Sequence, residues 1–162
     1  MISKTKKNHN SFLSHLDDSI HAVFKVALLM HKKGYDIRIN GLKKAKAHKE
    51  WKNFKDEGDL FVKIKGIEKR IEVKALSASF TDSTNWPFNN KFIVCAKHSF
   101  EGCENRPSAY IILNKEQTHA AYIDVEETES HWYTESRVDT RYQDISQEFY
   151  FCPINLVKWK NL

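Results

Sequence analysis

The sequence has no long apolar run. The longest one, AVFKVALLM at 22–30, is interrupted by Lys25. It is far shorter than the roughly 20 apolar residues that a membrane-spanning helix needs. The N-terminal stretch MISKTKKNHNSFL is polar and basic, and it lacks the apolar core of a secretory signal. These absences argue against a membrane-spanning or secreted protein, and we expect a cytoplasmic location.

Cysteine is scarce, and histidine is not arranged for metal binding. The three cysteines, Cys95, Cys103 and Cys152, form no C-x-x-C pair. An odd number of cysteines argues against a disulfide framework and fits a reducing compartment. The eight histidines contain no H-E-x-x-H motif and no Cys/His cluster with zinc spacing. The sequence therefore does not predict a zinc site.

The overall composition is that of a soluble globular protein. The chain has 162 residues, of which 41% are hydrophobic and 29% charged, which suits one domain with a sizeable core. We expect residues 1–10 to be a basic flexible arm and 11–162 to form the domain. Lys and Arg outnumber Asp and Glu by 26 to 21, giving a net charge of +5. Such an excess is consistent with a polyanionic partner if the positive charge is clustered.

Hydrophobic spacing predicts one helix followed mainly by strands. Apolar residues recur every three or four positions from Ser14 to about Lys33, and Gly34 follows as a stop. The expected strands are 35–40, a hairpin of 59–65 and 69–77 joined at Gly66, 91–97, 109–114 paired with 119–125, and a last one before Pro153. Segment 80–90 is expected to be a loop. This order indicates a mixed α/β (α+β) domain.

The stretch RIEVKAL at 70–76 carries the first candidate site residues. In an extended strand its alternation places Glu72 and Lys74 on one face. An E-x-K triplet alone is weak, since it should arise about once per hundred residues at average usage. The chain contains another, Glu50-Trp51-Lys52, in a segment without strand alternation. What distinguishes Glu72 is Asp59, which opens the other strand of the hairpin and could converge with it to bind Mg²⁺.

The densest positive charge directly precedes Asp59. The candidate nucleic-acid-binding residues of this segment are Lys43, Lys44, Lys46, Lys49, Trp51, Lys52 and Lys55. Lysines would contact phosphates, and the tryptophan could stack on an unpaired base. The alternative interpretations are a solvated charged face and aromatic side chains that belong to the core.

Asp59 followed by Glu72-Val73-Lys74, in a strand–turn–strand, resembles the PD-(D/E)XK nuclease superfamily. This is the restriction-endonuclease-like fold, in which a central mixed sheet flanked by helices carries the site. Over roughly 50–158 the chain also resembles small phage-type nucleases of this superfamily; a phage-encoded protein would act in the host cytoplasm. The resemblance implies a phosphodiesterase dependent on Mg²⁺ or Mn²⁺, foremost a DNA endonuclease. Asp59 and Glu72 carry over as metal ligands and Lys74 as the catalytic lysine.

The sequence departs from the family pattern at two places. Gly58 stands where a proline is usual before the first Asp, and the leading helix has no Glu for a further metal ligand. Asp17 or Asp18 could substitute for that Glu, and Asp56 could act as an outer carboxylate.

Other interpretations stay open. The hairpin could be solvent-facing with ordinary cross-strand charge pairs, which Lys63 and Lys65 make credible. The chain could be a catalytically silent nucleic-acid-binding module with a nuclease-like fold. It could also be a protein-binding factor that docks through 43–55 and 124–129. The sequence does not distinguish DNA from RNA, and cutting both strands of a duplex would make a homodimer convenient.

Three further side chains have expected roles. Cys95 is expected to be buried and inert. Asn114 is expected to cap the hairpin that follows it. Trp86, in the loop 80–90, is either packed inside or exposed as a wedge toward a substrate.

Overall fold

The computed structural model describes residues 19–40, 59–138 and 146–162. An N-terminal helix is described over 19–32 and ends at Gly34, whose φ is +86°. Gly34 N–H donates to His31 O (2.8 Å) and Tyr35 N–H donates to Met30 O (3.2 Å). Glycine suits this left-handed position because it has no Cβ. The predicted helix and its stop are confirmed here; the expected start at Ser14 lies outside the described residues.

The remaining elements are short helices and strands. The strands are β1 (Asp36–Ile39), β2 (Leu60–Ile64), β3 (Ile67–Ala75), β4 (Lys91–Ala96), β5 (Ala109–Leu113), β6 (His119–Asp124), β7 (Tyr133–Val138), β8 (Ser146–Pro153) and β9 (Lys158–Asn161). The helices are α2 (Lys97–Glu101) and α3 (Val125–Thr128), with 3-10 turns η2 (Ser83–Asn85), η3 (Glu129–His131) and η4 (Ile154–Leu156).

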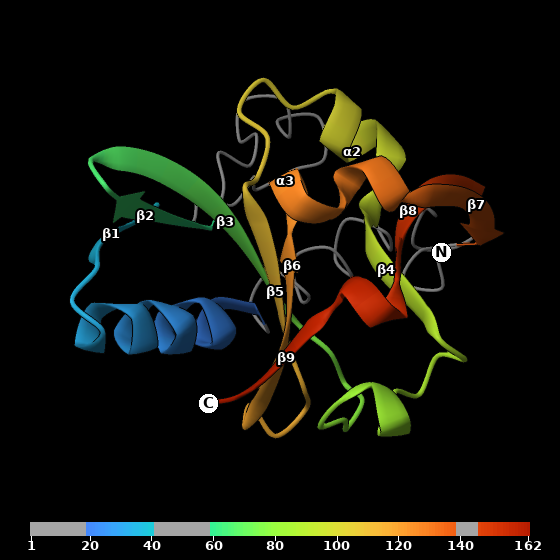
Figure 1. The fold of residues 1–162 in the computed structure, drawn as a ribbon, viewed down its shortest axis with the longest axis horizontal. Coiled ribbons are helices and arrows are strands. Elements are labelled where there is room, and N and C mark those ends of the chain that lie inside the picture. The colour runs from blue at the N-terminus through green and yellow to red at the C-terminus, as the bar shows by residue number, and fades with distance from the viewer. Residues whose placement is uncertain (1–18, 41–58, 139–145) are drawn as a thin grey trace, which may run out of the picture.

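The strands form two sheets. Six lie in the order β1-β2-β3-β5-β6-β9, and three lie in the order β4-β8-β7. Every neighbouring pair is antiparallel except β3 and β5, which are parallel. In Figure 1 the N-terminal helix lies on one side of the six-stranded sheet, and the three-stranded sheet lies on the other. The predicted mixed α+β class, with an N-terminal helix and a central mixed sheet, is confirmed.

The centre of the six-stranded sheet is buried on both faces. On one face, Val73 and Ile111 pack with Val23 and Val26 of the N-terminal helix. On the other face, Tyr110 and Ile112 pack with Phe92 and Val94 of β4 and with the aromatic rings of Phe80, Trp86 and Phe100. Successive residues of a strand point to opposite faces. Since Ile71 and Val73 face the helix, Arg70, Glu72 and Lys74 must face the second sheet.

The predicted loop over 80–90 is an organised part of the core. Asp82 accepts the N–H of Thr84 (2.8 Å) and caps the η2 turn. Trp86 stacks on Phe92 with ring centroids 4.7 Å apart, and its indole N–H donates to Lys91 O (3.0 Å). Trp86 is therefore a packed core residue, whereas the neighbouring Phe88 is exposed.

Strands with few apolar residues were the ones that the sequence pattern missed. The strand expected before Pro153 occurs as β8, but β7 and β9 were not predicted. Strand β9 has the sequence KWKN, in which Trp159 is the single apolar residue, and β7 carries only Tyr133 and Val138. Both are edge strands, so cross-strand pairing stabilises them more than an alternating pattern can reveal.

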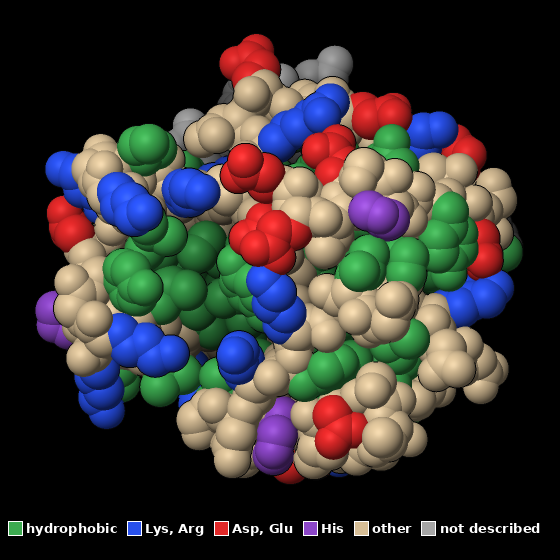
Figure 2. Space-filling model, viewed as in Figure 1, with side chains coloured by type: hydrophobic (Ala, Val, Ile, Leu, Met, Phe, Trp, Pro, Cys, Tyr) green, Lys and Arg blue, Asp and Glu red, His purple; other side chains and the backbone are tan. Residues whose placement is uncertain are grey.

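Some apolar side chains stay exposed on the helix side. Phe24 and Leu28 are about half exposed on the outer face of the N-terminal helix. Figure 2 shows apolar side chains gathered on the side of the molecule that carries this helix, with Lys and Arg around them. Among the described residues, no helix is both long and apolar enough to cross a membrane.

Asn114 caps the turn between β5 and β6, as expected from the sequence. It is buried; its Nδ2 donates to Phe80 O (3.0 Å), and its Oδ1 accepts from Thr118 N (2.9 Å) and His119 N (3.2 Å). We expect Asn114→Ala to lower the free energy of unfolding by about 3 kcal/mol, because it leaves buried backbone groups unpaired. Urea denaturation measures this, with the exposed Asn161→Ala as control; equal stability of both variants would contradict it.

Candidate functional site

The β2–β3 hairpin brings Asp59 to the part of β3 that carries Glu72. Lys65 and Gly66 connect the strands, and both have positive φ (50° and 82°), as in a type I′ turn. The turn fixes the register from Ile64 opposite Ile67 to Leu60 opposite Ile71. Continued by one residue, this register would bring Asp59 next to Glu72 at the open end of the hairpin. The hairpin predicted from the sequence is thus confirmed.

Asp59 is anchored to the backbone of the neighbouring strand. Its Oδ2 accepts the N–H of Val73 at 2.9 Å. The last pair of the β2–β3 ladder joins Leu60 to Ile71, so Val73 has no partner residue in β2. The Asp59 carboxylate provides the acceptor for its N–H instead. This bond uses one oxygen of the Asp59 carboxylate and holds the side chain beside β3.

Glu72 is bound by an arginine that the sequence interpretation did not include. Its Oε1 accepts from Arg70 Nε (2.8 Å) and from Arg70 Nη2. The side chains of Arg70 and Glu72 are only 8% and 12% exposed. The Arg70 Nη1 donates to Asn105 O (2.9 Å) and contacts Cys103 Sγ (2.9 Å). The guanidinium therefore links Glu72 to the loop between α2 and β5.

Lys74 reaches across to the second sheet. Its ammonium donates to Val94 O and lies 5.2 Å from the centroid of the Tyr110 ring. Val94 is the extra residue of a β-bulge, because Ile93 pairs with Phe151 and the next pair joins Cys95 to Tyr150. A bulge leaves its extra residue out of the ladder. Here the bulge leaves a carbonyl that the ammonium of Lys74 can bind.

Tyr110 and Cys95 complete a small polar cluster between the two sheets. Tyr110 is the parallel neighbour of Glu72 in β5, and both Tyr110 and Cys95 are buried. Burial raises the pKa of the Tyr110 hydroxyl, and the adjacent Cys95 raises it further. Burial also raises the pKa of the Cys95 thiol. Both groups are therefore neutral near pH 7. We call Arg70, Glu72, Lys74, Cys95 and Tyr110 the inter-sheet cluster.

The charges of the inter-sheet cluster suit an anionic ligand together with a cation. Glu72 lies between two cations, Arg70 and Lys74, and Asp59 supplies a second carboxylate at the hairpin end. Partial burial lowers the local dielectric constant, so each of these charges acts more strongly than it would in bulk water. The arrangement can hold a phosphate through its cations and a divalent metal ion through its carboxylates.

The donor set fits a hard divalent cation that keeps most of its water. Mg²⁺ usually binds one or two carboxylates, and water or substrate phosphate supplies the other ligands. Asp59, bound to the backbone of β3 at Val73, and the adjacent Glu72 provide two carboxylates of this kind. In the described part of the chain, no group of three or more His, Cys, Asp or Glu side chains could hold a metal ion. A site here would depend on water and substrate for its remaining ligands.

All seven predicted nucleic-acid-binding residues lie outside the described residues. These are Lys43, Lys44, Lys46, Lys49, Trp51, Lys52 and Lys55. The possible additional carboxylates Asp17, Asp18 and Asp56 also lie outside them. Of the residues expected to act in catalysis, Asp59, Glu72 and Lys74 are described, all at one end of the β2–β3 hairpin.

Sequence reasoning missed Arg70 and Tyr110. The strand alternation in RIEVK already places Arg70 on the same face as Glu72, so its position was available from the pattern. The ion pair between Arg70 and Glu72 could not be predicted, because it depends on the second sheet covering this face of β3. Tyr110 becomes a neighbour of Glu72 only through the parallel pairing of β3 and β5, which no local pattern predicts.

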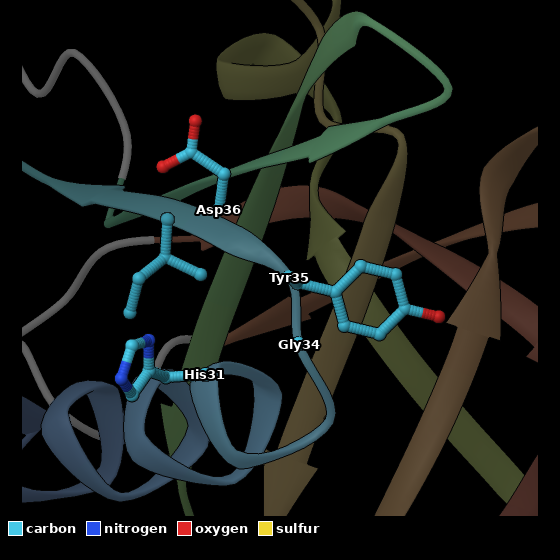
Figure 3. A pocket seen from close by; sticks show the side chains of 5 residues that line it. His31, Gly34, Tyr35 and Asp36 are labelled. Carbon is cyan, nitrogen blue, oxygen red and sulfur yellow. The ribbon is translucent and has the colours of Figure 1, made fainter.

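A hollow at the end of the N-terminal helix is a weaker candidate. It measures about 500 Å³ and is lined by His31, Gly34, Tyr35, Asp36 and Ile37. Figure 3 shows that the side chains of His31, Tyr35 and Asp36 point in different directions. They do not converge on one position where a ligand could be held.

The acidic stretch at 124–129 is largely paired with surface cations. Asp124 caps α3 by accepting the N–H of Glu127 (3.2 Å), and Glu127 pairs with Lys158. Glu129 lies 3.4 Å from Arg106. The stretch is thus tied to its own surroundings.

Comparison with known proteins found no relative: no family model, no curated protein and no solved structure matches this chain.

The thiols should differ sharply in reactivity. Cys95 and Cys152 are buried, and burial raises the pKa of both. Cys103 is partly exposed in the loop that holds Arg70. Because the thiolate is the reactive form, we expect one of the three thiols to react quickly with an aromatic disulfide reagent at pH 8. Cys103→Ser should remove this fast phase; a fast phase that persists would show that the inter-sheet region opens readily.

Proposed function

We propose that the protein is a Mg²⁺-dependent nuclease that hydrolyses phosphodiester bonds, most directly as a DNA endonuclease. The observation that carries the proposal is that the Asp59 carboxylate accepts the N–H of Val73, the residue between Glu72 and Lys74 on β3. This arrangement agrees with the resemblance to the PD-(D/E)XK superfamily. Its local geometry also suits metal-dependent hydrolysis of a phosphodiester bond.

Each residue has a distinct role in this proposal. Asp59 and Glu72 would hold the divalent ion beside the scissile phosphate. The ion, when bound, supplies positive charge that stabilises the transition state and the leaving oxygen. Lys74 would orient the attacking water and contact a phosphate oxygen. Its ammonium, now bonded to Val94 O, would have to turn toward the substrate.

The strand order supports the proposal. The N-terminal helix is followed by β1, by the β2–β3 hairpin that carries the three residues, and then by β5 parallel to β3. The family core has the same leading helix, strand and hairpin, and its mixed sheet carries the site. The second face is covered here by the three-stranded sheet and α2 rather than by helices alone.

The proposed partner is nucleic acid. The positive net charge and the lysine-rich segment 43–55, which directly precedes Asp59 in the chain, support phosphate contacts. Cleavage of both strands of a duplex would use two copies of the chain as a homodimer. A cytoplasmic site of action is part of the same proposal.

A second candidate function is a nucleic-acid-binding module that does not cleave. The specific observation in its favour is that Arg70 holds Glu72, while Lys74 is bound to a backbone carbonyl. Charged groups that are paired in this way can serve structure alone. Salt-dependent binding of DNA without cleavage of any substrate would favour this candidate.

Cleavage assays with three substituted proteins test the proposed nuclease. With Mg²⁺ or Mn²⁺ and plasmid, branched or single-stranded DNA, wild type should cleave and EDTA should stop it. Asp59→Asn, Glu72→Gln and Lys74→Met should each reduce the rate by about 10²-fold or more, because each removes a charge at the reacting phosphate. Asparagine at position 59 keeps an acceptor for the Val73 N–H, so the fold should survive.

The chain offers matched controls on the same strand. Glu68 pairs with Arg38 as Glu72 pairs with Arg70, but the Glu68 pair is about half exposed at the far end of the hairpin. Glu68→Gln and Lys69→Ala should therefore cleave like wild type. Cleavage that survives EDTA, or that is equal in wild type and Lys74→Met, would contradict the proposed catalytic roles.

A further inference from the structure

We propose that Arg70 competes with the divalent cation for the Glu72 carboxylate, so that Arg70 sets the metal affinity of the free protein. This inference rests on the proposed function, since it concerns the same carboxylate. It adds a residue that the E-x-K motif does not contain. Arg70 acts here as a positioning residue that must release Oε1 of Glu72 before this oxygen can bind a metal ion.

The geometry of the pair makes the competition direct. Arg70 Nε and Nη2 both donate to the same oxygen of Glu72, Oε1. A cation that binds this oxygen must displace both donors, because an N–H and a metal ion cannot both lie on the same lone pairs. The side chains are 8% and 12% exposed, so water offers little screening. Displacing Arg70 from Glu72 therefore costs free energy, and this cost lowers the apparent affinity of the protein for metal.

Arg70 has other acceptors that can keep it in place after it leaves Glu72. Its Nη1 donates to Asn105 O and contacts Cys103 Sγ, both in the loop between α2 and β5. The backbone of this loop is tied to β3, because Ser108 N–H donates to Arg70 O (2.8 Å). The guanidinium can thus release the carboxylate without losing all of its partners.

A phosphate group would favour the release. Guanidinium binds phosphate and carboxylate oxygens with the same forked geometry. A phosphodiester entering near Lys74 can therefore take the guanidinium donors, which leaves Glu72 to the metal ion. Metal and phosphodiester would then bind more tightly together than either does alone, and linkage requires this effect to be reciprocal.

The Arg38–Glu68 pair provides an internal comparison. It joins the same two residue types with the same charges, across β1 and β3, and Arg38 Nη2 lies 2.6 Å from Glu68 Oε1. Its side chains are 52% and 51% exposed, against 8% and 12% for Arg70 and Glu72. Solvent screens the exposed pair, and Asp59 lies at the part of β3 that carries Glu72 rather than Glu68. Substitution there should leave metal binding unchanged.

The test is a titration of the whole chain with Mn²⁺ alone, without nucleic acid, followed by the electron paramagnetic resonance signal of free Mn²⁺. Arg70→Gln should bind Mn²⁺ about 10- to 100-fold more tightly than wild type, as expected for losing hydrogen bonds from a charged competitor. Arg38→Gln should match wild type. Arg106 lies in the same loop as the partners of Arg70, but it pairs with Glu129. Arg106→Gln removes the same charge, and it should also match wild type.

The outcomes separate this inference from the proposed function. If wild type binds Mn²⁺, Glu72→Gln does not and Arg70→Gln binds no more tightly than wild type, the competition is refuted while the metal site stands. If Arg106→Gln gains as much as Arg70→Gln, the effect is general electrostatics and the competition is again refuted. If neither wild type nor Arg70→Gln binds Mn²⁺, both proposals fail.

A second measurement on wild type covers the case in which Arg70→Gln does not fold. The Nε–H of Arg70 is buried in its bond to Glu72, so it should exchange slowly with solvent in ¹⁵N-labelled protein. Saturating Mg²⁺ should shift this resonance and accelerate its exchange by about tenfold or more. An unchanged Arg70 Nε–H, with the Glu72 carboxyl ¹³C resonance shifted by Mg²⁺, would overturn the inference.

Discussion

The burial of strand β3 on both faces is the constraint on which the candidate site depends. Ile71 and Val73 face the N-terminal helix, so Glu72 and Lys74 face the second sheet instead of open water. A charged group that leaves water must find partners, or the protein is destabilised. From Arg70 to Lys74 the polar face of β3 is therefore provided with bonding partners, whatever its chemical role.

Irregular backbone supplies those neighbours. Lys74 binds the carbonyl of Val94, which a bulge in β4 leaves out of its ladder. Arg70 binds the carbonyl of Asn105 in the loop before β5. Regular strands would have used these carbonyls for their own pairing, so the departures from regularity are what allow buried cations here.

Local patterns predicted the parts of this arrangement that depend on neighbours in sequence. Alternation identified β2 and β3, and Gly66 marked their turn, which is enough to predict that Asp59 and Glu72 lie at the same end of the hairpin. The Arg70–Glu72 pair could not be foreseen, because it forms only once the second sheet excludes water. The proximity of Tyr110 depends on parallel pairing between strands far apart in the chain. Edge strands β7 and β9 were missed because pairing, not apolar content, defines them.

The inter-sheet charges are hard to explain by stability alone. Replacing a buried ion pair by apolar residues of similar shape is often neutral or stabilising, since desolvation offsets much of the attraction. Arg70, Glu72 and Lys74 fill a space that an apolar layer could fill with less cost, as Ile112 does beside them. What charged residues add is a response to ions, because a divalent cation competes for the carboxylate and a phosphate competes for the guanidinium. Internal bonds that such ligands could replace are what the proposed nuclease function requires, whereas an apolar layer would offer no such exchange.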